Sequence, residues 1–286
     1  MKQGLPSAGQ GEEAAEPLPS YEQAASRALE AFLVATSSRA EQPRAIRAIT
    51  FHMLEGHAPR FFERWKLGPR LEEAVRAMED LPLEFPSGLD PDDGIARVDA
   101  VYLRHERNLP YVLPERGAFT HYLQHLDETG SSLYAWLLSE LMKACGLTVP
   151  LVFPERPFKP LSRLLDLYWV THLYLLDTRY FHAPLRSPKA SEWTKDLLGA
   201  APWVLEERRL DLAGEVAFCL QAAGAAGSDE HRRLLDALLR AQQPDGRVVD
   251  LTLGDGQASQ DEMNHTTAAA LIAFAGAEEH RPDTAR

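Results

Sequence analysis

The sequence feature that most constrains the fold is the stretch over residues 161–182, LSRLLDLYWVTHLYLLDTRYFH. Its first two-thirds is apolar almost all the way round, with no polar stripe at helical spacing. A helix that is hydrophobic on every side is buried inside a larger protein or in a membrane. The apolar run is shorter than the ~20 residues that a membrane span needs, and Asp166 and His172 interrupt it. We therefore predict a buried core helix.

The rest of the chain favours an all-α fold. Apolar residues recur at helical spacing, and no segment alternates as a strand does over more than four or five residues. The predicted helices cover residues 21–36, 42–56, 69–80, 98–105, 118–127, 131–145, 213–223, 231–241 and 266–277. Residues 81–97, LPLEFPSGLDPDDGIAR, are rich in Pro, Gly and Asp, which predicts a long loop or a series of turns.

Length and composition suggest one large domain. We predict a disordered tail over residues 1–19, a single all-α domain over residues 20–278, and a frayed C-terminus over residues 279–286. The formal net charge is −12, which argues against nucleic acid and against an anionic membrane surface as partners. Cys145 and Cys219 lie in apolar helical patterns and are expected to be buried thiols. With no apolar leader segment, we expect a cytoplasmic protein.

Three predicted helices form a weak internal repeat, because each is an apolar run with small residues: YWVTHLYLLDT, DLAGEVAFCLQAAG and NHTTAAALIAFAG. Each begins near a polar group, and these groups are His172, Glu215 and His265. Helix-pair repeats at ~40–50 residues indicate a stack of helical hairpins, which either closes into a ring or stays open as a solenoid.

The segment LLRAQQPDGRV, between the second and third of these helices, carries a resemblance to a known superfamily. Gln242, Asp245 and Gly246 match the Gln-x-x-Asp-Gly turn of the α/α-toroid superfamily, which includes squalene-cyclase-type terpenoid cyclases and the β subunits of protein prenyltransferases. NHTTAAALIAFAGA also resembles the prenyltransferase inner helix that carries a zinc-binding histidine, with His265 at the matching position. The resemblance covers roughly residues 160–278.

The resemblance implies an architecture and no activity. It implies stacked helical hairpins forming an α/α-toroid-like barrel, closed or partly open. The aromatic residue that usually follows the glycine is replaced by Arg247 and Val248. The acid motif DxDD of the cyclases and the Asp-x-Cys zinc pair of the prenyltransferases are absent, so neither activity transfers to this chain.

The candidate catalytic residues are His172, Glu215, His265 and Asp177. If the inner helices are parallel in a ring, His172, Glu215 and His265 approach one another in the central cavity. Two histidines and a carboxylate suit a divalent metal such as zinc, or acid–base chemistry.

Each candidate also has a structural interpretation. His172 could be a hydrogen-bonded core histidine, Asp177 could cap a helix or pair with Arg179, Glu215 could cap a helix, and His265 could lie on the surface. The pairs His121/His125 and His52/His57 are weaker signals, because a spacing of four or five residues without further motif residues is common on solvated helix faces.

These patterns predict an enzyme of bacterial secondary metabolism that acts on a small molecule in a central helical-barrel pocket. The reaction could be of the lyase, cyclase or hydrolase type. The alternatives are a non-catalytic helical-repeat protein that binds a peptide or protein partner, and an accessory subunit of a biosynthetic assembly.

Overall fold

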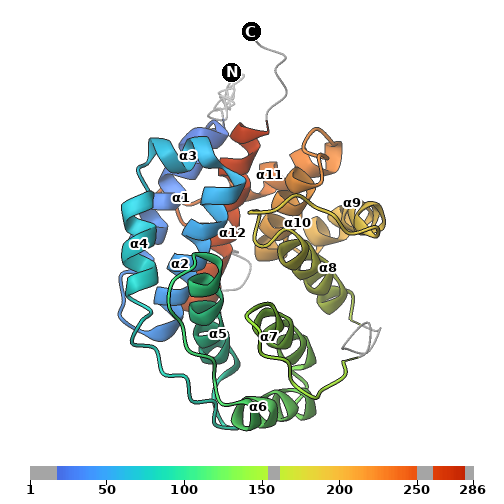
Figure 1. Ribbon diagram of the computed structural model, residues 1–286. Helices are drawn as coiled ribbons and strands as arrows, with labels where there is room; N and C mark the ends of the chain where they lie inside the picture. The colour runs from blue at the N-terminus through green and yellow to red at the C-terminus, as the bar shows by residue number, and fades with distance from the viewer. Residues whose placement is uncertain (1–17, 154–161, 250–259, 281–286) are drawn as a thin grey trace, which may run out of the picture.

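The computed structural model describes residues 18–153, 162–249 and 260–280, and over these residues the fold is all-α, as predicted (Figure 1). The described residues form twelve helices and one isolated β-bridge, between Gln242 and Val248. The helices are α1 (Tyr21–Ala35), α2 (Glu41–His57), α3 (Pro59–Arg64), α4 (Gly68–Arg76), α5 (Pro91–Glu106), α6 (Arg116–Glu128), α7 (Ser132–Ala144), α8 (Arg163–Asp177), α9 (Ala190–Glu206), α10 (Leu210–Ala222), α11 (Asp229–Ala241) and α12 (Gln260–Glu279). The predicted N-terminal tail and frayed C-terminus lie almost wholly outside the described residues.

Side-chain caps explain where several helices begin. Ser20 and Gln23 bond to each other's backbone N–H groups in a capping box at the start of α1. Asp90 accepts a hydrogen bond from the backbone N–H of Asp92 at the start of α5.

The predicted loop over residues 81–97 is therefore too long. Pro91 occupies the first turn of α5, where its missing N–H costs nothing, so residues 91–97 are helical. Residues 190–206, which were not predicted as a helix, form α9 around an internal proline, Pro202.

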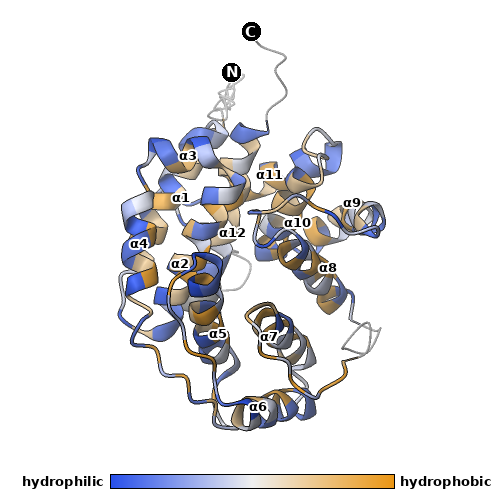
Figure 2. Ribbon diagram, in the orientation of Figure 1, coloured by the Kyte–Doolittle hydropathy of each residue, from blue (hydrophilic) through white to orange (hydrophobic). Residues whose placement is uncertain are grey.

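Six helices contact one another in succession, in the order α2, α5, α7, α8, α10 and α12, and α12 contacts α2 again. Other helices pack against this set: α1 on α12, α4 on α2, α6 on α7, and α9 and α11 on α10 (Figure 1). The apolar faces turn inward and the hydrophilic faces outward (Figure 2).

The most deeply buried helices are α10 and α12, and the prediction for the stretch at 161–182 needs correction. Every residue over 212–221 of α10 and over 267–277 of α12 is buried. By contrast, α8 keeps a partly exposed side that includes Leu164, Leu173 and Leu176. It packs mainly against α7, α9 and α10, whereas α12 packs against α1, α2, α3, α10 and α11. Small alanine side chains allow α12 to take this central place.

The two cysteines are buried free thiols, as predicted. Within the described residues, none of the helices combines the length and the apolar character that crossing a membrane requires.

The turn that carries the superfamily resemblance joins the end of α11 to α1. The side-chain amide of Gln242 donates to the backbone carbonyls of Ala24 in α1 and of Gly246. The carboxylate of Asp245 accepts a hydrogen bond from the backbone N–H of Arg247. Gly246 has a φ of 90°, and a Cβ at this position would overlap the carbonyl of Arg27.

We expect Gly246→Ala to destabilise the protein. The left-handed backbone alone should lower the free energy of unfolding by roughly 1–3 kcal/mol, and the overlap with Arg27 adds to this. Urea denaturation measures the loss. Gly227→Ala is the matched control, because a Cβ there meets nothing within 4 Å. Equal stability of the two variants would contradict the role assigned to this turn.

Candidate functional site

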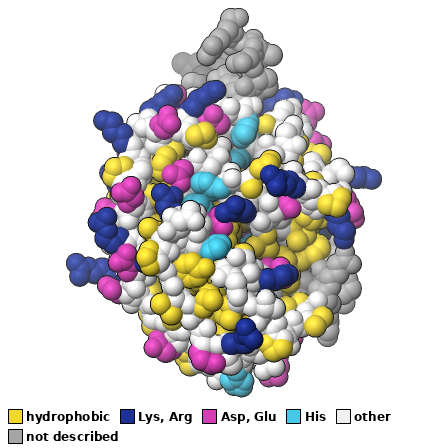
Figure 3. All heavy atoms as spheres, viewed as in Figure 1, with side chains coloured by type: hydrophobic (Ala, Val, Ile, Leu, Met, Phe, Trp, Pro, Cys, Tyr) yellow, Lys and Arg dark blue, Asp and Glu magenta, His cyan; other side chains and the backbone are white. Residues whose placement is uncertain are grey.

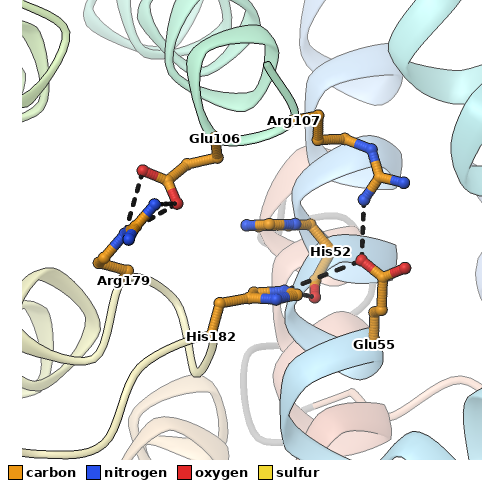
Figure 4. A pocket seen from close by; sticks show the side chains of 6 residues that line it. All are labelled: His52, Glu55, Glu106, Arg107, Arg179 and His182. Carbon is orange, nitrogen blue, oxygen red and sulfur yellow. Dashed lines mark hydrogen bonds and ion pairs between the residues drawn. The ribbon is translucent and has the colours of Figure 1, made fainter. Parts of the chain in front are cut away.

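A polar cleft of about 220 Å³ opens between α2, the end of α5 and the turn that follows α8 (Figure 4). Six ionisable side chains line it: His52, Glu55, Glu106, Arg107, Arg179 and His182. Histidine side chains gather in the middle of this face, among basic and acidic side chains (Figure 3). A second hollow, of about 270 Å³, is lined mostly by apolar side chains and lacks this concentration of reactive groups.

The helix α2 supplies His52 and Glu55, which share a face because they are three residues apart. The His52 side chain lines the cleft although the residue is only 2% exposed. Among the described residues, neither of its ring nitrogens has a hydrogen-bond partner. Burial, and then the charges of His182, Arg107 and Arg179, lower the pKa of His52 to about 2. The imidazole is therefore neutral at physiological pH.

Two ion pairs fix the charged walls of the cleft. Arg107 donates from Nη1 to Glu55 Oε2 at 2.8 Å and so joins α5 to α2. Arg179 donates from Nη2 and Nε to Glu106 Oε2, at 2.6 and 3.0 Å, and so joins the turn after α8 to α5. Such charge-assisted bonds hold the three segments in register.

The turn over residues 178–182 is strained. Arg179, Tyr180 and Phe181 have φ values of 49°, 53° and 73°, although none is glycine. A left-handed backbone costs about 1–2 kcal/mol per non-glycine residue. The strain places Arg179 and His182 at the cleft, and strain of this kind is often found at functional sites.

Packing on both sides holds the turn in place. The ring of Tyr180 packs on Tyr102, with centroids 5.3 Å apart. Phe181 packs on His57 and Phe218, at 4.3 and 5.6 Å. The packing of the buried Tyr180 and the partly buried Phe181 offsets the backbone strain.

His182 lies against His52. Their rings stack with centroids 3.9 Å apart and planes 12° apart. His182 Nε2 donates to the backbone carbonyl of His52 at 2.8 Å and lies 4.0 Å from Glu55 Oε2. His52, Glu55 and His182 each offer one atom that could bind a metal, and these three atoms lie within 4.8 Å of one another. In the described part of the chain, no other group of three metal-ligating side chains lies this close together.

The close approach of the turn to α2 requires a glycine. A Cβ on Gly56 would lie 2.7 Å from the carbonyl oxygen of Phe181. We therefore expect Gly56→Ala to destabilise the protein, although Gly→Ala inside a helix normally stabilises by up to about 1 kcal/mol. Thermal denaturation measures the difference.

The control for this prediction is Gly199→Ala in α9, where a Cβ meets nothing within 4 Å. We expect Gly199→Ala to be neutral or stabilising. If Gly56→Ala stabilised the protein to the same degree, the packing of the turn against α2 would be disproved.

The structure brings together two of the residues predicted from the sequence, Glu215 and His265. Glu215 Oε1 lies 3.5 Å from His265 Nε2, and its Oε2 accepts a hydrogen bond from the Thr171 hydroxyl at 2.6 Å. Burial raises the pKa of Glu215 to about 7, against the opposing effects of His265 and Thr171. The His265 side chain is 49% exposed.

The predicted metal triad does not assemble, because His172 does not join this pair. His172 Nδ1 donates to the carbonyl of Tyr168 in its own helix at 2.6 Å, and burial lowers its pKa. The side chain of α8 that reaches Glu215 is that of Thr171, and adjacent residues of a helix point about 100° apart. In the described residues, His172, Glu215 and His265 form no group with metal-ligand spacing.

Asp177 has a backbone-capping role. Its carboxylate accepts hydrogen bonds from the backbone N–H groups of Arg186 and Ser187, at 2.7 and 3.0 Å. It therefore holds the loop before α9. Arg179, the alternative partner considered from the sequence, binds Glu106 instead.

The buried carboxyl of Glu215 predicts a pH effect on stability. Between pH 4.5 and about pH 7 the unfolded carboxyl releases its proton while the folded one retains it, so this group makes folding less favourable as the pH rises. Over this pH range the free energy of unfolding falls by about 3 kcal/mol because of Glu215, at about 1.36 kcal/mol per pH unit. The free energy of unfolding of Glu215→Gln, minus that of wild type, should therefore rise by about 3 kcal/mol between pH 4.5 and pH 8.

Urea denaturation at both pH values checks this prediction. Glu140→Gln, at a solvent-exposed ion pair on α7, is the control and should show little pH-dependent difference from wild type. A stability difference between Glu215→Gln and wild type that did not change with pH would contradict it.

The residues of the cleft were missed because their partners are distant in sequence. His52 was considered only with His57, yet His57 packs beneath the turn, and the cleft partner of His52 is His182, 130 residues away. The one local signal was the spacing of three residues between His52 and Glu55, which places both on one helix face.

Comparison with known proteins found a match to a family model of unknown function over less than half of the chain. Residues 156–275 match a model described as "Domain of unknown function (DUF6895)". The match includes Arg179, His182, Glu215 and His265, whereas His52 lies outside it. The comparison with curated proteins gave no match, and neither did the comparison with solved structures.

Proposed function

We propose that the protein is an enzyme that acts on a small polar molecule bound in the cleft between α2, α5 and the turn after α8. The observation that carries this proposal is the convergence of six ionisable side chains from three separate segments, one of them a buried imidazole with no hydrogen-bond partner among the described residues. A concave site in which a few polar groups converge is the usual setting for binding and chemistry.

The arginines favour an anionic substrate. A guanidinium has five N–H donors, and Glu106 uses only those on Nη2 and Nε of Arg179. The Arg179 side chain is 56% exposed, so its remaining donors can reach a carboxylate or phosphate group that enters the cleft. The chemistry would be acid–base or metal-assisted, in a reaction of the lyase, cyclase or hydrolase type.

The proposal includes an α/α-toroid-like arrangement of the helices. The succession of contacts from α2 through α5, α7, α8 and α10 to α12 and back to α2 supports it, as does the packing of α1, α4, α6, α9 and α11 against this set. The proposed bacterial origin is supported only by composition, since the sequence is rich in Ala, Arg and Pro and has few Lys and Asn residues. The cytoplasmic location is supported by the two free thiols.

The test is ligand binding by the full chain. Small carboxylates and phosphate monoesters are screened by thermal shift, and at least one class should raise the melting temperature, because a ligand that binds only the folded state stabilises it. Arg179→Gln should abolish the shift. Arg232→Gln, at an exposed arginine paired with Asp229 on α11, should retain it.

Mass spectrometry of the bound compounds then shows whether they are converted. Conversion that depends on Arg179 supports the enzyme. Binding without conversion favours the non-catalytic alternative. The absence of any shift with either class, or equal shifts in the two variants, would contradict the assignment of the cleft.

A further inference from the structure

We propose that His52, Glu55 and His182 form a binding site for one divalent transition-metal ion, with zinc as the best fit. The inference deepens the proposed function and rests on it for the role of the metal in catalysis. Metal binding itself can be measured without a substrate.

The donor set is the first argument. Two imidazole nitrogens and one carboxylate oxygen are a ligand set of catalytic zinc sites, which keep the fourth position open for water or substrate. Here the three ligand atoms lie within 4.8 Å of one another. Bonds of 2.0–2.2 Å in a tetrahedral site place ligand atoms about 3.4 Å apart. A metal ion lies close to the plane of a ligating imidazole, and the rings of His52 and His182 are stacked with their planes 12° apart. The partly exposed His182 ring would therefore turn out of the stack, while the Glu55 side chain moves toward the ion.

The environment of His52 is the second, independent argument. A buried imidazole whose nitrogens make no hydrogen bond is costly, because nothing replaces the hydrogen bonds that it made to water. His52 is buried, has no hydrogen-bond partner among the described residues, and lines the cleft on the side of Glu55 and His182 (Figure 4). No hydrogen bond to either ring nitrogen would have to be broken for a metal ion to bind there.

Outer contacts already orient the other two ligands. Metal-binding histidines commonly donate a ring N–H to a backbone carbonyl, and ligating carboxylates are themselves hydrogen-bonded. Glu55 accepts from Arg107 at 2.8 Å. His182 donates from Nε2 to the carbonyl of His52 at 2.8 Å, so with this bond in place Nδ1 would be the nitrogen of His182 that binds the ion. These are the supporting bonds that a metal site requires.

The charge of the cleft is compatible with a cation. Arg107 and Arg179 would repel a metal ion, but each is paired with a glutamate that also lines the cleft. The charges of the two arginines and the two glutamates cancel. A bound divalent ion would make the cleft positive, which matches the anionic substrate proposed above, and would polarise a substrate oxygen or a bound water.

The experiment is a titration of Zn²⁺ into the full chain, purified without a histidine tag and freed of metal by a chelator. We expect one ion per chain with a dissociation constant in the micromolar range or below. Co²⁺ should give visible absorption bands from nitrogen and oxygen ligands. His182→Ala and Glu55→Gln should each weaken Zn²⁺ binding at least tenfold. His121→Ala, at an exposed histidine on α6, should leave it unchanged.

Circular dichroism confirms that each variant is folded, and two ligand variants are used so that the loss of one does not remove the test. The inference is overturned if the folded wild type binds neither Zn²⁺ nor Co²⁺ stoichiometrically, or if all three variants bind Zn²⁺ as wild type does. Its failure is distinct from failure of the proposed function, because the thermal-shift test of anion binding is repeated on the metal-free chain and depends on Arg179.

Discussion

A buried hydrogen bond between His57 and Gln221 is the interaction on which the arrangement of the cleft depends. His57 Nε2 lies 2.7 Å from Gln221 Oε1, and both residues are almost fully buried. The amide nitrogen of Gln221 continues to His231 in α11 and to the carbonyl of Ala273 in α12. One side chain thus connects α10 to α2, α11 and α12. Since an amide oxygen only accepts, His57 carries its proton on Nε2.

This network fixes both sides of the cleft. The helix α2 carries His52 and Glu55, and α10 supplies Phe218, on which Phe181 of the strained turn packs. His57 itself also packs against Phe181. Burial lowers the pKa of His57 to about 4, so the bond to Gln221 persists in neutral form at physiological pH. A shift of α2 relative to α10 would leave buried polar groups unpaired, at about 1–3 kcal/mol each.

Four buried ionisable side chains differ in how far hydrogen bonding explains their burial. His57 and His231 are buried within a hydrogen-bond network that connects helices. His52 is equally buried but contributes no such bond among the described residues, and Glu215 retains a proton to about neutral pH despite its partners. Perturbed groups without a sufficient structural explanation are the better candidates for function. Of these two residues, His52 lines the cleft, and it belongs to both the proposed substrate site and the proposed metal site.

Local sequence patterns determined the helices, and tertiary structure determined the site. Helical periodicity identified α6, α7, α10, α11 and α12, and it also identified Glu215 and His265, which do come together. It missed α9, because Pro202 is a local signal against a helix and only packing overrides it. It also assigned the central position to α8, since apolar composition does not reveal how many neighbours a helix will have.

Local sequence patterns also do not determine which individual side chains face one another. Whether His172 or Thr171 faces Glu215 depends on the rotation of α8 about its axis, which the contacts with α7, α9 and α10 set. The pairing of His52 with His182 depends on a turn held in left-handed backbone conformations by its packing on α2 and α10. The sequence by itself determined that the chain is helical and where most helices lie, because those signals are local. The tertiary structure alone decided which reactive side chains meet, because contacts between residues 130 positions apart leave no trace in local periodicity.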